Sequence, residues 1–324
     1  MRRLASVVLV GLLAFGAQAD ESEVASSSPK ETADFKVFGV FNDLSDFNVF
    51  NDINFFNNIP DIKDFRKVCG LDFMSITAGA DLRSAYLSRG KVLEARPMSS
   101  QLLSADIPLK PLAPIGRIGF DFWTISSLTH KMDTMHKNMF FQERDLTIRY
   151  GYDWQISDDW RLASDVMRTW VNLPGYRHGL DHSVHEWRCA QRLENPWITP
   201  YYLVRRAVHP RDWLYVRVGV QHAFRLTDTL TFTPNFYGEG GNEKHYQQRY
   251  GAKDPAWSRY HSGVQALNAM FTLSWKISSW ASVYASVQQF GLVDSDARHR
   301  VKAKKTHNSR RDLTVGTVGI VCKF

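Results

Sequence analysis

The feature that most constrains the fold is a strict alternation of residue types between positions 145 and 156. Successive side chains of a β-strand point to opposite faces, so this pattern predicts a strand with one apolar and one polar face. A soluble sandwich would produce the same alternation. Aromatic residues gather toward one end of the apolar row, which favours a strand between lipid and a wet lumen. The apolar row is Leu146, Ile148, Tyr150, Tyr152, Trp154 and Ile156, and the other row is Asp145, Thr147, Arg149, Gly151, Asp153 and Gln155.

Similar alternation recurs along residues 71–324 and predicts about twelve strands. The expected strands are 74–87, 98–107, 117–128, 145–156, 160–171, 184–193, 197–206, 213–224, 230–237, 264–275, 280–290 and 313–324. Connections after even-numbered strands are short and most of those after odd-numbered strands are long, with the link near His209 as the exception. Sorting of this kind predicts an all-β, up-and-down antiparallel transmembrane barrel with both termini at the short-turn end.

The last twelve residues, LTVGTVGIVCKF, form the strand expected to close the barrel by pairing with the first one. A chain that ends in such a strand with a terminal aromatic residue resembles the bacterial outer-membrane β-barrels. The resemblance implies that the barrel assembly machinery recognises this C-terminal strand. The residues that carry this expectation are Val318, Ile320 and Phe324.

The N-terminal residues indicate the compartment. Arg2 and Arg3 precede an apolar run at 7–14 and a small-residue cleavage site at 17–19, so residues 1–19 are expected to be a signal peptide. This implies secretion and, with the barrel, location in the outer membrane of a Gram-negative bacterium. Residues 20–70 are polar and then rich in Phe, Asn and Asp. This arm could be mobile, cover the periplasmic mouth, plug the lumen or dock a partner.

Two short segments resemble the TorF-like porin family. Its first strand leads into an aromatic-x-x-Arg-Gly turn, and residues 80–90 read ADLRSAYLSRG, with Tyr86, Arg89 and Gly90 in those places. Its later strands end in loops that contain Gly and Asn, and residues 236–242 read FYGEGGN. The resemblance implies an outer-membrane channel of undefined substrate and carries over no catalytic residue.

Charged residues on the polar rows are candidates to line the lumen. They carry both signs, so they could face a water-filled pore or pair with one another and close a narrow interior. The candidates are Asp81, Arg83, Asp121, Arg149, Asp153 and Arg217.

A basic run at 297–311 is the strongest charge feature. It could be a solvated loop, or it could contact the phosphates of lipopolysaccharide at the outer surface. Nucleic acid is not an expected partner, because a secreted chain seldom meets it. The basic residues are Arg298, Arg300, Lys302, Lys304, Lys305, Arg310 and Arg311.

Enzymatic chemistry finds little support. The segment HGLDHSVHE at 178–186 has metal-ligand residue types but helical spacing within a predicted loop and strand. A His-x-Ser pair, which outer-membrane phospholipases place on a strand, occurs at 307–309 within the basic run. Cys69, Cys189 and Cys322 are too few and too far apart for a disulfide framework. We therefore expect no enzyme activity, no cofactor and no metal.

Taken together, these patterns predict a passive porin-like channel for small polar solutes in the outer membrane. Three alternatives stay open: a closed structural or adhesion barrel, an outer-membrane hydrolase, and a secreted β-sandwich.

Overall fold

A computed structural model describes residues 74–109, 116–129, 143–173, 183–209, 212–250, 262–303 and 310–324. The expected signal peptide and N-terminal arm at 1–70, together with Cys69, lie outside the described residues. So do Lys304, Lys305, the His-x-Ser pair at 307–309 and residues 178–182 of the His-rich segment 178–186.

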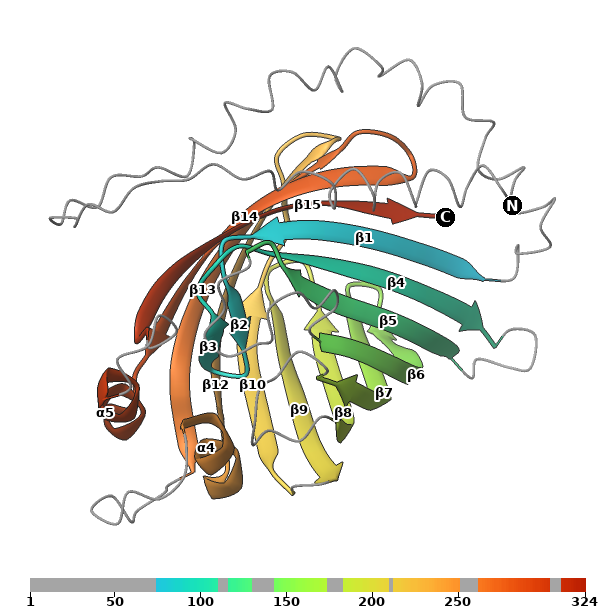
Figure 1. Cartoon of the computed structure of the whole chain (residues 1–324). Helices are drawn as coiled ribbons and strands as arrows, with labels where there is room; N and C mark the ends of the chain where they lie inside the picture. The colour runs from blue at the N-terminus through green and yellow to red at the C-terminus, as the bar shows by residue number, and fades with distance from the viewer. Residues whose placement is uncertain are drawn as a thin grey trace, which may run out of the picture. The chain divides into compact units, whose positions relative to one another are not determined.

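Twelve long antiparallel strands of the described residues form a closed barrel (Figure 1). Each strand pairs with both of its neighbours, and the ring closes because β1 pairs with β15 and β10 pairs with β12. A two-residue strand, β11 (Phe224–Arg225), lies between β10 and β12 in the sequence and pairs with the start of β12. The barrel strands are β1 (Ser75–Arg83), β4 (Met98–Pro108), β5 (Arg117–Ser127), β6 (Glu143–Ser157), β7 (Trp160–Asn172), β8 (Ser183–Glu194), β9 (Thr199–His209), β10 (Leu214–Gln221), β12 (Leu230–Gly241), β13 (Gly263–Lys276), β14 (Ala281–Leu292) and β15 (Asp312–Lys323). All twelve expected strands are confirmed, and a two-sheet sandwich is excluded.

The closing seam joins the two ends of the barrel sequence. β15 pairs with β1 from Thr77 opposite Lys323 to Arg83 opposite Thr317. The backbone of Phe324 continues the pairing, since its N–H donates to the carbonyl of Ile76 at 2.8 Å. Its ring stacks on Trp280 with centroids 6.1 Å apart. The predicted pairing of the last strand with the first is therefore confirmed.

The two faces of the wall differ as the alternation predicts. On β6, Leu146 is 49% exposed and Trp154 is 56% exposed on the outer face, whereas inward-facing Thr147 is 5% exposed. Comparable apolar side chains cover the outer face around the barrel. They include Phe120, Phe122, Ile148, Val166, Val218, Phe236, Leu267, Phe271, Leu273, Val287, Val318 and Ile320.

Aromatic residues gather at the short-turn rim. Trp154, Trp197, Phe224 and Trp275 are all exposed there, next to the short connections. Trp197 also lies edge-on to Trp160, with centroids 6.1 Å apart. Such a girdle is what amphipathic rings form at a boundary between an apolar medium and water.

The opposite rim carries structure that the alternation does not predict. It comprises a hairpin of β2 (Tyr86–Ser88) and β3 (Lys91–Glu94), and two helices, α4 (Glu243–Tyr250) and α5 (Ser295–Ala303). The expected first strand extends to residue 87. In the structure β1 ends at Arg83, and a separate hairpin follows. Part of the basic run is a helix and not a loop. Neither helix of the described chain has the length and apolar composition of a membrane-spanning helix.

The segment 236–242, expected to be a loop, is mostly strand. β12 extends to Gly241 and stays paired with β13, with an irregularity between Glu239 and Gly240. A Cβ on Gly240 would lie 1.8 Å from the carbonyl oxygen of Gly263, so the absence of a side chain permits this close approach. Asn242 then ends the strand and caps α4, because its side-chain oxygen accepts the N–H of His245 at 3.0 Å.

Candidate functional site

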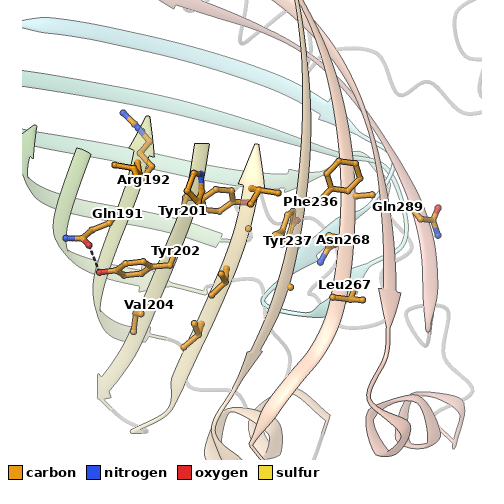
Figure 2. A pocket seen from close by; sticks show the side chains of 18 of the residues that line it. Gln191, Arg192, Tyr201, Tyr202, Val204, Phe236, Tyr237, Leu267, Asn268 and Gln289 are labelled. Carbon is orange, nitrogen blue, oxygen red and sulfur yellow. Dashed lines mark hydrogen bonds between the residues drawn. The ribbon is translucent and has the colours of Figure 1, made fainter. Parts of the chain in front are cut away.

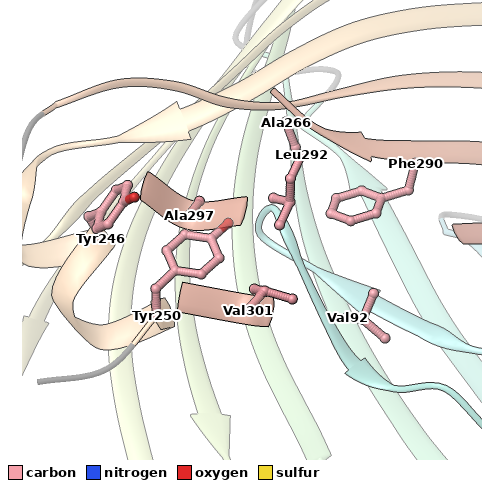
Figure 3. Packing of buried hydrophobic residues seen from close by; sticks show 8 residues of the cluster. All are labelled: Val92, Tyr246, Tyr250, Ala266, Phe290, Leu292, Ala297 and Val301. Atoms are coloured by element: carbon pink, nitrogen blue, oxygen red, sulfur yellow. The ribbon is translucent and has the colours of Figure 1, made fainter. Parts of the chain in front are cut away.

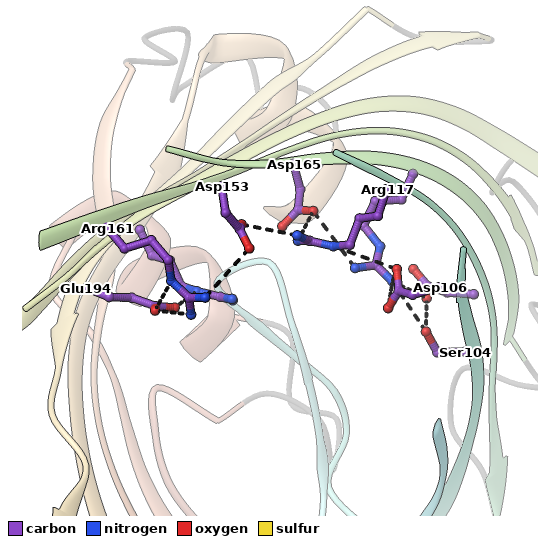
Figure 4. Close-up of polar contacts among 10 residues, drawn as sticks. Ser104, Asp106, Arg117, Asp153, Arg161, Asp165 and Glu194 are labelled. Carbon is purple, nitrogen blue, oxygen red and sulfur yellow. Dashed lines mark hydrogen bonds and ion pairs between the residues drawn. The ribbon is translucent and has the colours of Figure 1, made fainter. Parts of the chain in front are cut away.

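Opposite charges form a continuous ladder on the inner faces of β4 to β7 (Figure 4). Arg149 of β6 lies at its centre, with Nη2 3.1 Å from a carboxylate oxygen of Asp121 and 3.1 Å from one of Asp106. Arg117 of β5 contacts Asp165 at 2.9 Å and Asp153 at 3.1 Å. Register places these residues at neighbouring inward positions, so each charge has a partner on an adjacent strand or the next one.

The ladder continues to the short-turn end on β7 and β8. Arg161 lies 3.7 Å from Asp153 and also pairs with Glu194, which in turn accepts a 2.6 Å contact from Arg192. These charges keep much of their surface exposed, with Arg161 at 44% and Arg192 at 45%. Water therefore reaches this part of the inner wall.

The other half of the inner wall is lined by tyrosines and amides around two further ion pairs. Arg83 pairs with Asp81, and the hydroxyl of Tyr284 donates to Asp81 at 3.1 Å. Arg217 lies 3.2 Å from Glu239. Glu239 also accepts a hydrogen bond from Asn268, and Gln288 bridges Asn268 and Tyr237.

The β2–β3 hairpin crosses the interior near the long-loop end. Its turn residues, Arg89 and Gly90, have φ values of 50° and 76°, and Ser88 pairs with Lys91 across them. Positive φ at both central positions defines a type I′ turn, which Gly90 accommodates readily. The hairpin leaves the wall between β1 and β4, yet Arg89 forms an ion pair with Glu186 of β8. In the strand order, β8 lies on the far side of the ring, so the hairpin spans the bore.

Further contacts hold the hairpin in place. Tyr86 donates to Glu143 of β6 at 2.8 Å, and Tyr250 of α4 donates to the carbonyl oxygen of Gly90. The Arg89 guanidinium also lies 5.1 Å from the centre of the Trp213 ring. Burial alone would lower the pKa of Arg89, but the carboxylates of Glu186 and Glu143 raise it above its ordinary value. Arg89 is therefore a fixed cation in a buried pocket.

Both helices pack on this hairpin through a small apolar core (Figure 3). The core joins β3, α4, α5 and the wall strands β13 and β14, and its members are Val92, Tyr246, Tyr250, Ala266, Phe290, Leu292, Ala297 and Val301. Asp294 links the helices, because it accepts a 2.6 Å hydrogen bond from Tyr246 and caps α5 through the N–H of Ala297 at 2.7 Å. The three loop segments thus form one packed unit, which we call the loop plug (β2–β3, α4 and α5).

The ion-paired side chains become less exposed toward the loop plug. In the middle of the barrel Arg149 is 16% exposed and Asp106 is 29% exposed. Beside the plug, Arg89 is 9% exposed and Glu186 is fully buried. The inner wall is therefore accessible to water in the middle of the barrel and at its short-turn end, and it is buried beside the loop plug at the long-loop end.

The structure places all six sequence-predicted lumen candidates on the inner wall. Five of them, Asp81, Arg83, Asp121, Arg149 and Asp153, belong to ion pairs on β1 and β4–β7, and Arg217 pairs on β10. Of the basic run, Arg298 lies 3.4 Å from Asp312 and Arg300 lies over the ring of Tyr246. Lys302, Arg310 and Arg311 are exposed.

Sequence reasoning missed the partners that matter at the plug. Glu143, Glu186 and Glu239 lie on inner faces toward the long-loop ends of their strands, and a buried acidic residue there is a signal for a cationic partner. The sequence indicated Arg89 only as part of the aromatic-x-x-Arg-Gly turn and did not indicate its partner. Glu186, part of the metal-like HGLDHSVHE segment, instead pairs with Arg89 and Arg188. No cluster of metal-ligating residues occurs among the described residues.

No family model matches the sequence, and no curated protein matches it. Solved structures of similar architecture include the NanC porin, at 9% identity and a TM-score of 0.42, covering 78% of this chain and 98% of that one. The KdgM porin matches at 10% identity and a TM-score of 0.41, covering 77% of this chain and 99% of that one. An outer-membrane channel from Pseudomonas putida F1 matches at 9% identity and a TM-score of 0.44, covering 78% and 95%. At these values the barrel assignment rests on the strand pairing of the chain itself.

Proposed function

We propose that this protein is an outer-membrane β-barrel that conducts small polar solutes by passive diffusion. The membrane location is supported by the outer face. A closed barrel has no second sheet to cover its exterior, yet that exterior carries large apolar side chains between an aromatic rim and the loop end. Burial of apolar surface gains about 25 cal/mol per Å², so lipid is the medium that stabilises this surface.

The observation that carries the channel proposal is the partial exposure of inward charges well inside the barrel. Arg149, Asp121 and Asp106 are ion-paired at the middle of the wall and still 16–29% exposed. A barrel filled by packed side chains would bury them as completely as Glu186 is buried beside the plug. We infer a water-filled passage from the short-turn mouth to the underside of the loop plug.

The loop plug would set the effective bore. It spans the interior at one level and is held by charged and aromatic contacts to β6, to β8 and to Trp213, the residue before β10. The passage beside it would accept small solutes and exclude folded macromolecules. Because the inner wall carries interleaved charges of both signs, we expect polar solutes to pass with weak preference for either ion sign.

The signal peptide at 1–19 and the role of the C-terminal strand remain part of the same proposal. Val318 and Ile320 face outward, and Phe324 extends the closing seam. The backbone edge of β15 that pairs with β1 would be unpaired before closure. Recognition of this strand by the barrel assembly machinery would precede its pairing with β1.

Planar-bilayer recording tests the proposal. Purified protein should produce stepwise current increments that scale with salt concentration. Folding of the barrel is checked by a gel band whose electrophoretic mobility changes when the sample is heated. The absence of current increments from such folded preparations would contradict the channel.

The second candidate is a closed structural or adhesion barrel, favoured by the dry contacts of Arg89, Tyr86 and Tyr250. For this candidate, the chain should insert into vesicles without increasing their permeability. Release of trapped dyes of graded size separates the two, because a channel leaks small dyes and retains large ones.

A further inference from the structure

The outer wall carries an apolar groove that follows one row of register partners (Figure 2). The row crosses seven strands from β8 to β15, and each member is directly opposite the next. It reads Gln191, Tyr202, Val218, Gly238, Leu267, Gly291 and Asp312. Because barrel strands are tilted, a row at right angles to them climbs obliquely. It starts near the short-turn end of β8 and finishes at the long-loop end of β15.

Missing side chains hollow out the groove. Gly238 and Gly291 contribute no side chain to the outer face and Ala269 contributes only a methyl group, while Phe236 and Leu267 stand beside them. The groove has a volume of about 1140 Å³ and a largely apolar lining. From Tyr202 to Gly291 it crosses four strand spacings, about 19 Å. That is comparable with the ~15 Å thickness of one hydrocarbon leaflet.

Polar side chains at the short-turn end of the groove form hydrogen bonds with one another. Tyr202 donates to Gln191 at 2.8 Å, and Gln191 donates to Ser164 at 3.1 Å. This end therefore presents hydrogen-bonded side chains and does not demand a polar ligand.

The upper end of the row meets a cationic pocket. Gly291 is opposite Asp312, and Asp312 pairs with Arg298 of α5 at 3.4 Å. The pocket has a volume of about 290 Å³, and its lining is Ser295, Arg298, His299, Lys302 and Arg311. The carboxylate of Asp312 would oppose a bound anion, but Arg298 offsets its charge.

The helix α5 is built to present this cationic pocket. Its lining residues at 295, 298, 299 and 302 follow the i, i+3, i+4, i+7 spacing of one helix face. Ala297 and Val301 lie on another face and pack into the loop plug. Packing therefore fixes the helix while its cations remain at the rim.

We propose that this outer surface binds a lipid with a phosphorylated headgroup, on the premise of the membrane location proposed above. The phosphate would lie among Arg298, Lys302 and Arg311, and an acyl chain would lie along the groove. Clustered cations bind phosphates through charge-assisted hydrogen bonds, and basic clusters at a membrane boundary attract anionic headgroups. Gly291 lines the groove, and its register partner Asp312 contacts Arg298 of the cationic pocket. This adjacency of an apolar groove and a cationic pocket favours an amphiphile over a free anion.

Titration of the detergent-purified barrel with bisphosphorylated lipid A, read by native mass spectrometry, tests this site. The double variant Lys302→Glu/Arg311→Glu should weaken binding about tenfold or more, because two cations are replaced by anions. The matched control Arg206→Glu/Arg225→Glu makes the same charge change at exposed positions outside the site. It should bind as the unaltered protein does.

Gly238→Leu tests the groove separately. A Cβ at this position would meet Leu267 at 3.4 Å, an ordinary contact, so the barrel should fold and the groove should be filled. The proposal requires weaker lipid A binding in this variant as well. Unchanged binding in Gly238→Leu, or full competition by inorganic phosphate, would overturn it in favour of a free-anion site. If the unaltered protein were a dimer and Gly238→Leu a monomer, the proposal would be overturned in favour of a second copy of the chain.

Folding of each variant is checked by the change in its electrophoretic mobility on heating. Conductance of the same preparations is recorded independently. Lipid binding without conductance would contradict the channel and leave this site standing, whereas conductance without lipid binding would do the reverse.

Discussion

Arg89, at the turn of the β2–β3 hairpin, is paired with Glu186 of β8, which lies 97 residues further along the chain and across the bore. Both side chains are buried, and Glu186 is also held by Arg188 at 3.0 Å. Removal of one member of a buried pair costs about 3–5 kcal/mol because the other charge is left without compensation. This contact is therefore the one expected to hold the loop plug across the bore of the barrel.

Arg89→Ala should loosen the hairpin and raise single-channel conductance or the fraction of time in the largest open level. A loss of about 3 kcal/mol corresponds to roughly a hundredfold change in an equilibrium between seated and displaced hairpins. Bilayer recording measures the effect, with Arg225→Ala at the exposed short-turn rim as the control. Unchanged conductance in Arg89→Ala would show that the hairpin does not limit the passage.

Removal of a cation and removal of an anion from the ion-pair ladder should change the charge selectivity of the channel in opposite directions. Arg149→Ala leaves Asp106 and Asp121 without their central cation and should shift the channel toward cations. Asp165→Asn removes a carboxylate that faces Arg117 and should shift it toward anions. Reversal potentials in a salt gradient measure both. Shifts of the same sign would place these residues outside the conducting path.

The seam between β14 and β15 depends on the space left by Gly319. A Cβ there would lie 2.6 Å from the ring of Tyr284, which covers the glycine on the inner face. Gly319→Val should therefore destabilise the barrel by about 1–3 kcal/mol through overpacking. Gly316→Val is the matched control on the same strand, since a Cβ there meets nothing within 4 Å.

Denaturant unfolding followed by electrophoretic mobility measures this difference. Equal unfolding midpoints for Gly319→Val and Gly316→Val would contradict the packing described for the seam.

The loop plug should lose stability in acid because of His245. Burial lowers the pKa of His245 well below the usual 6.5, and the neighbouring Arg249, Arg89 and Arg205 lower it further. The folded plug therefore keeps this imidazole neutral, whereas the unfolded segment takes up a proton below pH 6.5. Stability is full above that pH and falls as the pH decreases below it.

Hydrogen exchange of the α4 amides measures the effect between pH 7.5 and pH 5, after correction for intrinsic exchange rates. His245→Phe keeps a ring between Trp213 and Tyr215 and should remove the acid-dependent part of the loss. An identical pH dependence in this variant would assign the effect to another group.

The barrel could be predicted from sequence because one face of each strand carries apolar side chains and the other carries mostly polar ones. Alternation such as that from Leu146 to Ile156 therefore predicts which side chains face outward. The connection lengths predict which end of the barrel carries the short turns. The plug could not be predicted in this way. Its helices are short and their buried faces hold few apolar residues, such as Ala297 and Val301 in α5, so no period stands out.

Pairing across the bore was also beyond sequence reasoning. The inward position of Arg149 follows from strand parity alone, but its partners depend on the stagger of four strands. The contact of Arg89 with Glu186 depends further on the reach of the hairpin across the ring. Parity therefore predicts which residues face inward, and the three-dimensional register decides which of them meet.

Site-by-site accessibility along β6 in lipid vesicles tests the central claim most directly. Single substitutions to Cys at Thr147, Ile148, Arg149 and Tyr150, in a background without Cys69, Cys189 and Cys322, report on each face in turn. The account predicts that a water-soluble maleimide labels Arg149→Cys, and that a lipid-borne quencher reaches a probe on Ile148→Cys or Tyr150→Cys. Labelling by the water-soluble reagent at all four positions, with no quenching from lipid, would contradict a membrane-spanning barrel with a wet interior.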